Sequence, residues 1–155
     1  MNKEPLIYLA SPYTHVDDTL RHQRYVVISN VAGRLLLQGK MLFAPISQSH
    51  PIAEYTPELK TTAWADWMHI DLTMLVRCDQ LWVCTMVGWD ESTGVRGEIV
   101  AANYLNIPIF LLDPVTLSSC VMTDSQIEFF LGEERPGDRE ARDMALNVWN
   151  LKLGK

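Results

Sequence analysis

Two carboxylates occupy positions from which they could act on a small molecule. Glu98 lies near the start of an expected helix, after an apolar run at residues 80–84 and a glycine-rich turn. Such a run is typical of a parallel strand covered on both faces, and open α/β sheets bind ligands beyond the carboxyl ends of these strands. Asp71 is the one charged member of an apolar helical face, where burial would raise its pKa and make it a candidate general acid. Its alternative role is structural, as the partner of Arg77 or as a loop cap.

The turn before Glu98 could bring the backbone close to a ligand. Gly94 and Gly97 punctuate it, Ser92 adds a hydroxyl, and the following helix offers free N–H groups in its first turn. Structural roles remain open here too. The turn could be an ordinary tight turn, and Glu98 could serve the dipole of its helix.

Segments of strand type and helix type alternate along the chain, which predicts βαβ units and a mostly parallel sheet. Residues 45–57 between two of them are predicted to be a loop, and a loop of that length is uncommon in a compact domain unless it has a function. The expected strands are residues 6–10, 41–44, 80–84 and 107–112, and the expected helices are residues 18–39, 56–76 and 95–106, with two more capped by residues 123–124 and 136–138.

Composition limits the domain organisation and the partners. With 155 residues and 48% apolar content, the chain can bury one sizeable core but not two comfortably. We therefore predict a single α/β domain over residues 1–155, with a Rossmann-like or flavodoxin-like parallel sheet flanked by helices. A net charge of -6 argues against binding to a nucleic-acid polymer, which needs a basic face.

The remaining composition predicts neither a membrane segment nor a metal site. No run approaches the ~18 apolar residues of a membrane helix, so we expect a cytoplasmic protein without a membrane partner. Three cysteines and four histidines lack the spacing of metal ligands, and no cofactor is expected. Trp64, Trp67 and Trp89 are predicted to be core or pocket wall, where any of them could stack on a base.

Two motifs in combination carry a resemblance to a known family. IYLASPYTH lies near the start of the chain and GWDESTGVRGEIVAA near its middle. Over roughly residues 6 to 113, the chain resembles the nucleoside 2-deoxyribosyltransferase superfamily, in particular its small phage and bacterial members. The order and spacing of Asp71 with the following leucine, Asp79 and Glu98 also match that family.

The resemblance implies a catalytic role for three residues. Glu98 would attack the anomeric carbon of a deoxyribose or stabilise positive charge there, and Asp71 would protonate or position the departing base. Tyr8 matches the first-strand tyrosine that orients the glutamate in the family. Cleavage through an oxocarbenium-like transition state calls for one protonated and one ionised carboxyl, which agrees with this assignment.

One position in the second motif bears on the substrate. Ser92 stands where the family's nucleoside transferases carry an acid and its 5′-monophosphate N-hydrolases carry a phosphate-binding serine. This favours a 2′-deoxynucleoside 5′-monophosphate, with Ser92 and the amides of Gly94 and Gly97 around the phosphate and Arg96 adding charge. The hydrolases of the family have a Gly-Ser pair in their first-strand motif, and Ser11 lies one position away from that serine. The resemblance therefore assigns the serine's phosphate-binding role to Ser11 only approximately.

Alternatives to hydrolysis of a nucleotide stay open. Asp90 or Glu91 could meet a sugar hydroxyl, which would favour base exchange on nucleosides. A nucleotide-binding module without turnover is a third interpretation. The recognised base is not predicted, and the resemblance implies a homo-oligomer in which a neighbouring subunit completes the pocket.

Overall fold

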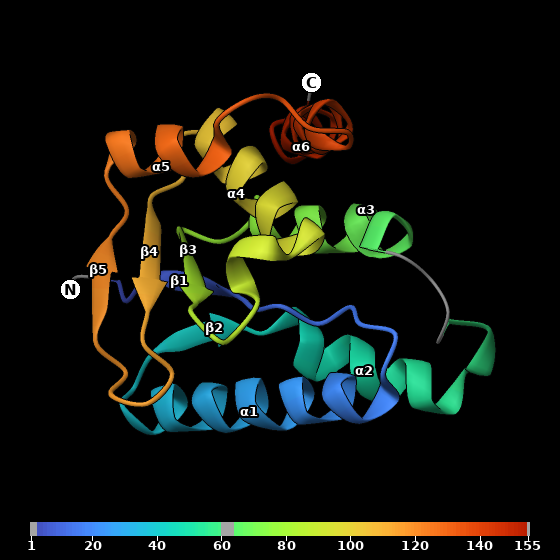
Figure 1. Ribbon diagram of the computed structural model, residues 1–155. Coiled ribbons are helices and arrows are strands. Elements are labelled where there is room, and N and C mark those ends of the chain that lie inside the picture. Colours follow the sequence, from blue (N-terminus) through green and yellow to red (C-terminus); the bar gives the residue numbers. More distant parts are fainter. Residues whose placement is uncertain (1–2, 60–63, 155) are drawn as a thin grey trace.

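The computed structural model describes residues 3–59 and 64–154. Its strands form one sheet in the order β2-β1-β3-β4-β5 (Figure 1). The strands are β1 (Leu6–Ala10), β2 (Met41–Phe43), β3 (Gln80–Cys84), β4 (Ile109–Leu112) and β5 (Ser119–Val121). β1 pairs in parallel with β2 and β3, β3 pairs in parallel with β4, and β5 is antiparallel to β4. The predicted α/β class with a mostly parallel sheet is confirmed.

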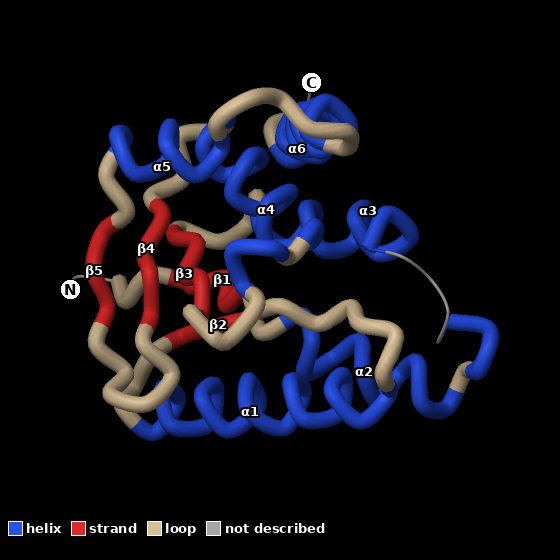
Figure 2. Tube along the Cα trace, viewed as in Figure 1, coloured by secondary structure: helices blue, strands red, loops and turns tan. Residues whose placement is uncertain are grey.

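Helices cover both faces of the sheet, with α1 and α2 on one side and α3 to α6 on the other (Figures 1 and 2). β1 divides its side chains between the two layers, as the two-residue period of a strand requires. Ile7 and Leu9 join the core under α1, whereas Tyr8 and Ala10 join the core under α3 and α4. The helices are α1 (Asp18–Leu37), α2 (Pro45–Tyr55), α3 (Trp64–Leu75), α4 (Thr93–Tyr104), α5 (Asp124–Leu131) and α6 (Asp138–Lys152), with 3-10 turns η1 (Pro57–Leu59) and η2 (Trp89–Glu91).

The strand order reverses direction at β1. β2 lies on one side of β1, while β3 and the later strands lie on the other, which is the order of a flavodoxin-like sheet. In such sheets the ligand binds at the carboxyl ends of the two strands that flank this switch point. The loops that leave β1 and β3 are therefore the expected place for a site.

The predicted loop at residues 45–57 is wrong, because residues 45 to 55 form α2. Pro45 takes the first position of the helix, where its missing N–H costs nothing. Pro51 lies inside the helix and would ordinarily oppose it. Buried His50 and Ala53 show what stabilises α2, namely packing against the rest of the domain rather than local preference.

Other boundaries agree with expectation or lie outside the described residues. The side chain of Asp17 caps α1 by accepting from Thr19 N at 2.8 Å, and Thr123 forms a capping box with Gln126 at the start of α5. The expected helix from residue 56 to 76 appears as η1 and α3, and its residues 60–63 are not among those described. β5 was not predicted, because its three residues are all exposed and show no alternation.

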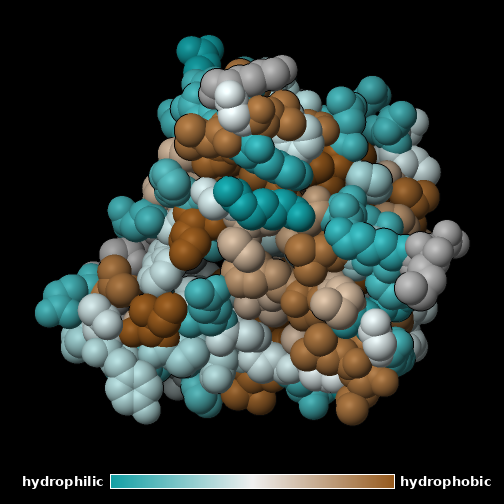
Figure 3. Space-filling model, turned by 180° about the vertical axis from the view of Figure 1, so that it is seen from behind, coloured by the Kyte–Doolittle hydropathy of each residue, from teal (hydrophilic) through white to brown (hydrophobic). Residues whose placement is uncertain are grey.

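The surface mixes hydrophilic and hydrophobic side chains, as the view from behind shows (Figure 3). Some apolar side chains are almost fully exposed, among them Val16, Val87 and Phe129. Isolated apolar residues are normal on protein surfaces, so a homo-oligomer stays a prediction. None of the described helices combines the length and apolar character needed to cross a membrane.

Candidate active site

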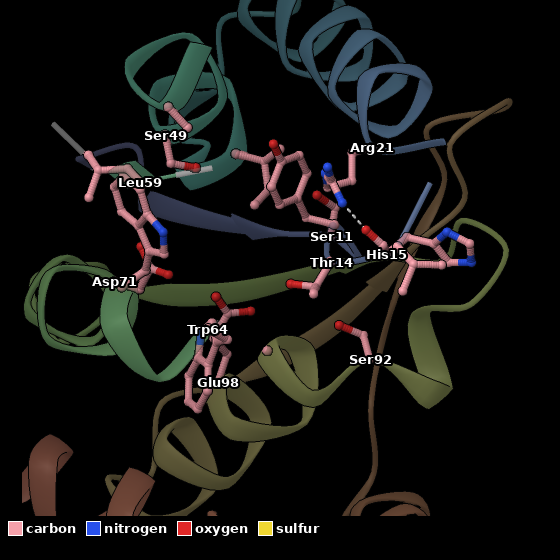
Figure 4. A pocket seen from close by; sticks show the side chains of 16 residues that line it. Ser11, Thr14, His15, Arg21, Ser49, Leu59, Trp64, Asp71, Ser92 and Glu98 are labelled. Atoms are coloured by element: carbon pink, nitrogen blue, oxygen red, sulfur yellow. Dashed lines mark hydrogen bonds between the residues drawn. The ribbon is translucent and has the colours of Figure 1, made fainter. Parts of the chain in front are cut away.

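A cavity of about 670 Å³ lies beside the loops that leave β1 and β3 (Figure 4). This volume suits a small organic ligand. Four groups of described residues build its walls: the loop after β1 with the start of α1, helix α2, residues of η1 and α3, and the start of α4. The lining residues are Ser11, Tyr13, Thr14, His15, Val16, Arg21, Ile46, Ser49, Ala53, Leu59, Trp64, Trp67, Asp71, Ser92, Gly94 and Glu98.

Glu98 reaches this cavity from the second turn of α4 and is only 4% exposed. The hydroxyl of Tyr8 donates a hydrogen bond of 2.7 Å to its Oε1. Burial raises the pKa of Glu98 well above its ordinary value, the nearby Asp71 raises it further, and the Tyr8 hydrogen bond opposes the shift. Burial, followed by the charge of Glu98, also raises the pKa of Tyr8, which therefore stays a neutral donor.

Asp71 lines the same cavity from α3 and is 7% exposed. Burial raises its pKa to about 7. The indole N–H of Trp64 opposes this shift, although it does not reach hydrogen-bond geometry with any described group. The alternative ion pair with Arg77 is not observed in the described chain, where that guanidinium donates to the carbonyl oxygen of Thr73 at 2.6 Å.

The two carboxyl groups have different surroundings although they share one cavity. Close carboxylates in a poorly solvated site resist ionising together, so a single negative charge is favoured. Tyr8 donates to Glu98, and such a donor stabilises the ionised form. Tyr8 thus favours charge on Glu98, whereas burial and the charge of Asp71 favour a proton there.

The loop after β1 contributes a buried hydroxyl with no partner. Ser11 is 7% exposed and lines the cavity, and its Oγ makes no hydrogen bond to the described residues. Buried polar atoms rarely stay unsatisfied, so this hydroxyl is available to a ligand or to water. Thr14, His15 and Arg21 line the cavity nearby, and Arg21 is bound to the His15 carbonyl and to Asp18 (Figure 4).

The start of α4 adds hydrogen-bond donors. Ser92 is the N-cap, and its Oγ accepts from the backbone N–H of Val95 at 3.3 Å, which leaves its own hydroxyl proton free to be donated. Thr93 and Gly94 are the first two helical residues, so their N–H groups have no acceptor within the helix. A helix start of this kind favours an anion.

Residues 5–113 match the model of a family described as a domain of unknown function, DUF1937. The chain belongs to this family. The matched region runs from β1 to the end of β4 and contains Tyr8, Asp71 and Glu98, whereas β5, α5 and α6 lie beyond it. No curated protein matches the chain.

Arg96 lies in the DUF1937 region but does not line the cavity, which corrects the predicted phosphate contact. Its Nε and Nη2 bind the two carboxylate oxygens of Asp138 at 2.9 and 2.7 Å. Nη1 donates to the carbonyl oxygen of Phe130, and Nη2 also reaches those of Leu131 and Glu133. This buried guanidinium therefore joins α4 to the C-terminal segment and is not available to a substrate.

Gly97 also has a different role from the one predicted. A Cβ on this glycine would lie 2.1 Å from the indole of Trp64, so a side chain there has no space. Gly94 abuts the same indole, at 3.0 Å, and also lines the cavity. Gly97 thus lets Trp64 lie against α4, whereas Gly94 keeps its predicted place beside a ligand.

Sequence reasoning did not assign Tyr13, His50 or Arg24 to the site. Tyr13 lines the cavity, and its hydroxyl lies 2.7 Å from Nδ1 of His50. Arg24 donates to the backbone carbonyls of Tyr13 and Thr14 and so fixes the loop after β1. The available signals were the aromatic and basic character of residues 13–24 and, for His50, the unusual length of the loop predicted at residues 45–57. Within the described ranges, no three side chains of histidine, cysteine, aspartate or glutamate form a group that could hold a metal ion.

Proposed function

We propose that this protein cleaves the N-glycosidic bond of a 2′-deoxynucleoside 5′-monophosphate, with water as the preferred acceptor. The observation that carries the proposal is the buried Glu98, hydrogen-bonded by Tyr8 and placed with Asp71 in one cavity at the sheet's switch point. The resemblance of the two motifs to the nucleoside 2-deoxyribosyltransferase superfamily supplies the reaction class. A cytoplasmic location and a homo-oligomeric state belong to the same proposal.

The reaction would proceed in two steps. In the first, the carboxylate of Glu98 forms a bond to the anomeric carbon as the carbon–nitrogen bond breaks, and Asp71 gives its proton to the departing base. In the second, water attacks the anomeric carbon, Asp71 accepts the water proton, and the bond to Glu98 breaks. The products are the free base and 2-deoxyribose 5-phosphate.

The start of α4 and the loop after β1 support a monophosphate as the substrate. The hydroxyls of Ser92 and Ser11 and the N–H of Gly94 offer uncharged donors to a phosphate. Arg21 lines the same cavity and replaces Arg96 as the source of positive charge. A phosphate held there would anchor the substrate while the carboxyl groups act on the glycosidic bond.

Product analysis tests the reaction class. Incubation of the protein with each of the four common deoxynucleoside monophosphates should release base and 2-deoxyribose 5-phosphate in equal amounts from at least one of them. Deoxynucleosides without phosphate should react much more slowly, because the phosphate contacts are lost. Absence of turnover on every monophosphate would refute the proposal.

Base exchange is the second candidate, and a neighbouring cavity favours it. This cavity of about 600 Å³ shares Ser92 and Gly94 with the first and is lined by Glu91. A carboxylate there would suit a sugar hydroxyl better than a phosphate. The same assay with an added free base separates the two reactions, since exchange yields a new nucleoside or nucleotide and hydrolysis yields 2-deoxyribose or its 5-phosphate.

Asp71 should give the reaction a distinctive pH dependence. Because its pKa is raised to about 7, the protonated acid is present below pH 7 and is lost as the pH rises above it. We expect kcat/KM to fall above pH 7, and Asp71→Asn to lower kcat by about 10²- to 10⁴-fold. The residual activity of the variant should lack the decline near pH 7. A decline that persists in Asp71→Asn would assign the titration to another group.

The raised pKa of Asp71 also makes the free energy of unfolding depend on pH. The direction of this dependence is opposite to that for an acid in an ion pair, whose pKa is lowered on folding. The folded-state pKa of Asp71 exceeds its ordinary value of 3.8, so the folded protein binds more protons than the unfolded chain between these values. The contribution of Asp71 to the free energy of unfolding therefore falls as the pH rises from about 4 through 7. Urea denaturation of the wild type and of Asp71→Asn across this range measures the difference.

A further inference from the structure

Three rings from separate segments meet beside the cavity. Tyr13 belongs to the loop after β1, Tyr25 to α1 and His50 to α2. The ring of His50 stacks on Tyr25 with centroids 4.2 Å apart and planes at 20°, and it meets Tyr13 edge-on at 5.7 Å and 83°. His50 is 5% exposed, so its ring is enclosed by these neighbours.

Tyr13 is fixed both at its hydroxyl and at its backbone. The hydroxyl shares a hydrogen bond of 2.7 Å with Nδ1 of His50, and the backbone carbonyl accepts from Arg24 Nη1 at 3.3 Å. Burial raises the pKa of Tyr13, so the phenol is neutral. Since His50 occupies the hydroxyl, Tyr13 presents its ring to the cavity that it lines.

The rest of the cavity suits a flat apolar group. Leu59, Trp64 and Trp67 line it from η1 and α3, and Ile46 lines it from α2. Aromatic rings on separate walls bind planar heterocycles by stacking, provided that the rings are held in place. The Tyr13 ring meets this condition, because the buried His50 holds its hydroxyl.

We propose that His50 is a positioning residue, which holds the Tyr13 ring as one wall of the base subsite and so sets affinity for the base. This inference rests on the proposed function to the extent that the cavity takes a nucleotide. His50 touches neither the sugar nor the phosphate in this assignment. Its loss should therefore change binding of the heterocycle and leave the bond-breaking step unchanged.

Two substitutions of His50 and one of Tyr13 test the inference. His50→Leu removes the hydrogen bond, whereas His50→Asn keeps a polar atom near the position of Nδ1. With the best of the four deoxynucleoside monophosphates, we expect His50→Leu to raise KM about five-fold, the value of one buried hydrogen bond, with kcat unchanged. His50→Asn should restore most of the affinity. Tyr13→Phe removes the same hydrogen bond from the other partner and replaces His50→Leu if that variant does not fold.

A second ligand separates positioning of the base from general damage. Tryptophan fluorescence, with Trp64 and Trp67 in the cavity wall, reports binding of the monophosphate and of 2-deoxyribose 5-phosphate, which lacks a base. Weaker binding of the monophosphate alone supports the inference. Equal weakening of both ligands, no weakening of either, or a fall in kcat alone would overturn it.

The same titrations distinguish failure of the proposed function from failure of the role proposed for His50. A wild type that binds a monophosphate without turnover would refute the reaction, and the binding ratio would still decide the role of His50. A wild type that binds neither ligand would overturn both proposals.

Discussion

Glu98→Gln is expected to abolish cleavage of deoxynucleoside monophosphates while substrate binding persists. The amide keeps the size of the carboxylate and can still accept the hydrogen bond from Tyr8, which is 2.7 Å long in the wild type. It cannot supply the negative charge or the nucleophilic oxygen that the anomeric carbon requires. Loss of a nucleophile lowers kcat by about 10⁴-fold or more in enzymes where it has been removed. Rate measurements with a sensitive assay for released base give the loss directly.

Folding provides the internal control for this variant. Burial raises the pKa of Glu98, so an ionised carboxylate at this position costs free energy that a neutral amide does not. We expect the melting temperature of Glu98→Gln at pH 8 to equal or exceed that of the wild type. Substrate affinity, measured by tryptophan fluorescence, should change little. A variant that retained more than a small percentage of the wild-type rate would rule out Glu98 as the nucleophile.

Tyr8→Phe is the matched comparison. This substitution removes only the hydroxyl that donates to Glu98 and leaves the ring in the core under α3 and α4. A smaller loss of kcat than in Glu98→Gln is expected, because the nucleophile remains but is less well oriented and less stabilised as an anion. Equal losses in both variants would show that orientation, rather than the carboxylate itself, limits the rate.

Much of the fold could be predicted because local pattern and tertiary structure agree. Continuous apolar runs identified the parallel strands, and the predicted cap at residues 123–124 marked a helix start that the structure confirms at Thr123. Tyr8 can reach Glu98 because alternate side chains of a strand point to opposite faces, and Tyr8 is on the face of β1 that packs against α3 and α4. That face could not be chosen from β1 alone, because both of its faces are buried.

The errors arose where distant parts of the chain decide the structure. α2 contains two prolines and few strong helix formers, so its packing against α1 and β1 explains why it is helical. Arg96 resembled a substrate contact because it lies between two glycines at the start of a helix. Its true partner, Asp138, is 42 positions away, and no local pattern signals it.

Breaking the pair of Arg96 and Asp138 should cause a large loss of stability without touching the cavity. Both side chains are less than 10% exposed, and their two hydrogen bonds are 2.9 and 2.7 Å long. Arg96→Met leaves the carboxylate of Asp138 buried. Among the described residues, the donor that it keeps is the backbone N–H of Arg135. Removing one partner of a buried pair costs about 3–5 kcal/mol, and urea denaturation at pH 7 measures the change in the free energy of unfolding.

An exposed ion pair of the same chemistry is the control. Arg142 binds Glu134 at 2.7 Å, but the two side chains are 34% and 53% exposed. Arg142→Met should therefore cost less than about 1 kcal/mol. A similar loss in both variants would show that removal of any arginine near α6 is destabilising, and that burial of the pair has no special effect.

A double variant tests whether the loss of unfolding free energy in Arg96→Met comes from an uncompensated buried charge. Arg96→Met combined with Asp138→Leu should be more stable than Arg96→Met alone, because no buried charge remains unpaired.

Hydrogen bonds from Arg96 hold the pKa of Asp138 below its ordinary value of 3.8. Its contribution to stability is therefore full above about pH 4 and is lost as the pH falls below that value. The difference in unfolding free energy between wild type and Arg96→Met should shrink as the pH is lowered through this range. Since α4 carries both Arg96 and Glu98, such a result would also show that the C-terminal segment, beyond the family region, stabilises the helix that bears the proposed nucleophile.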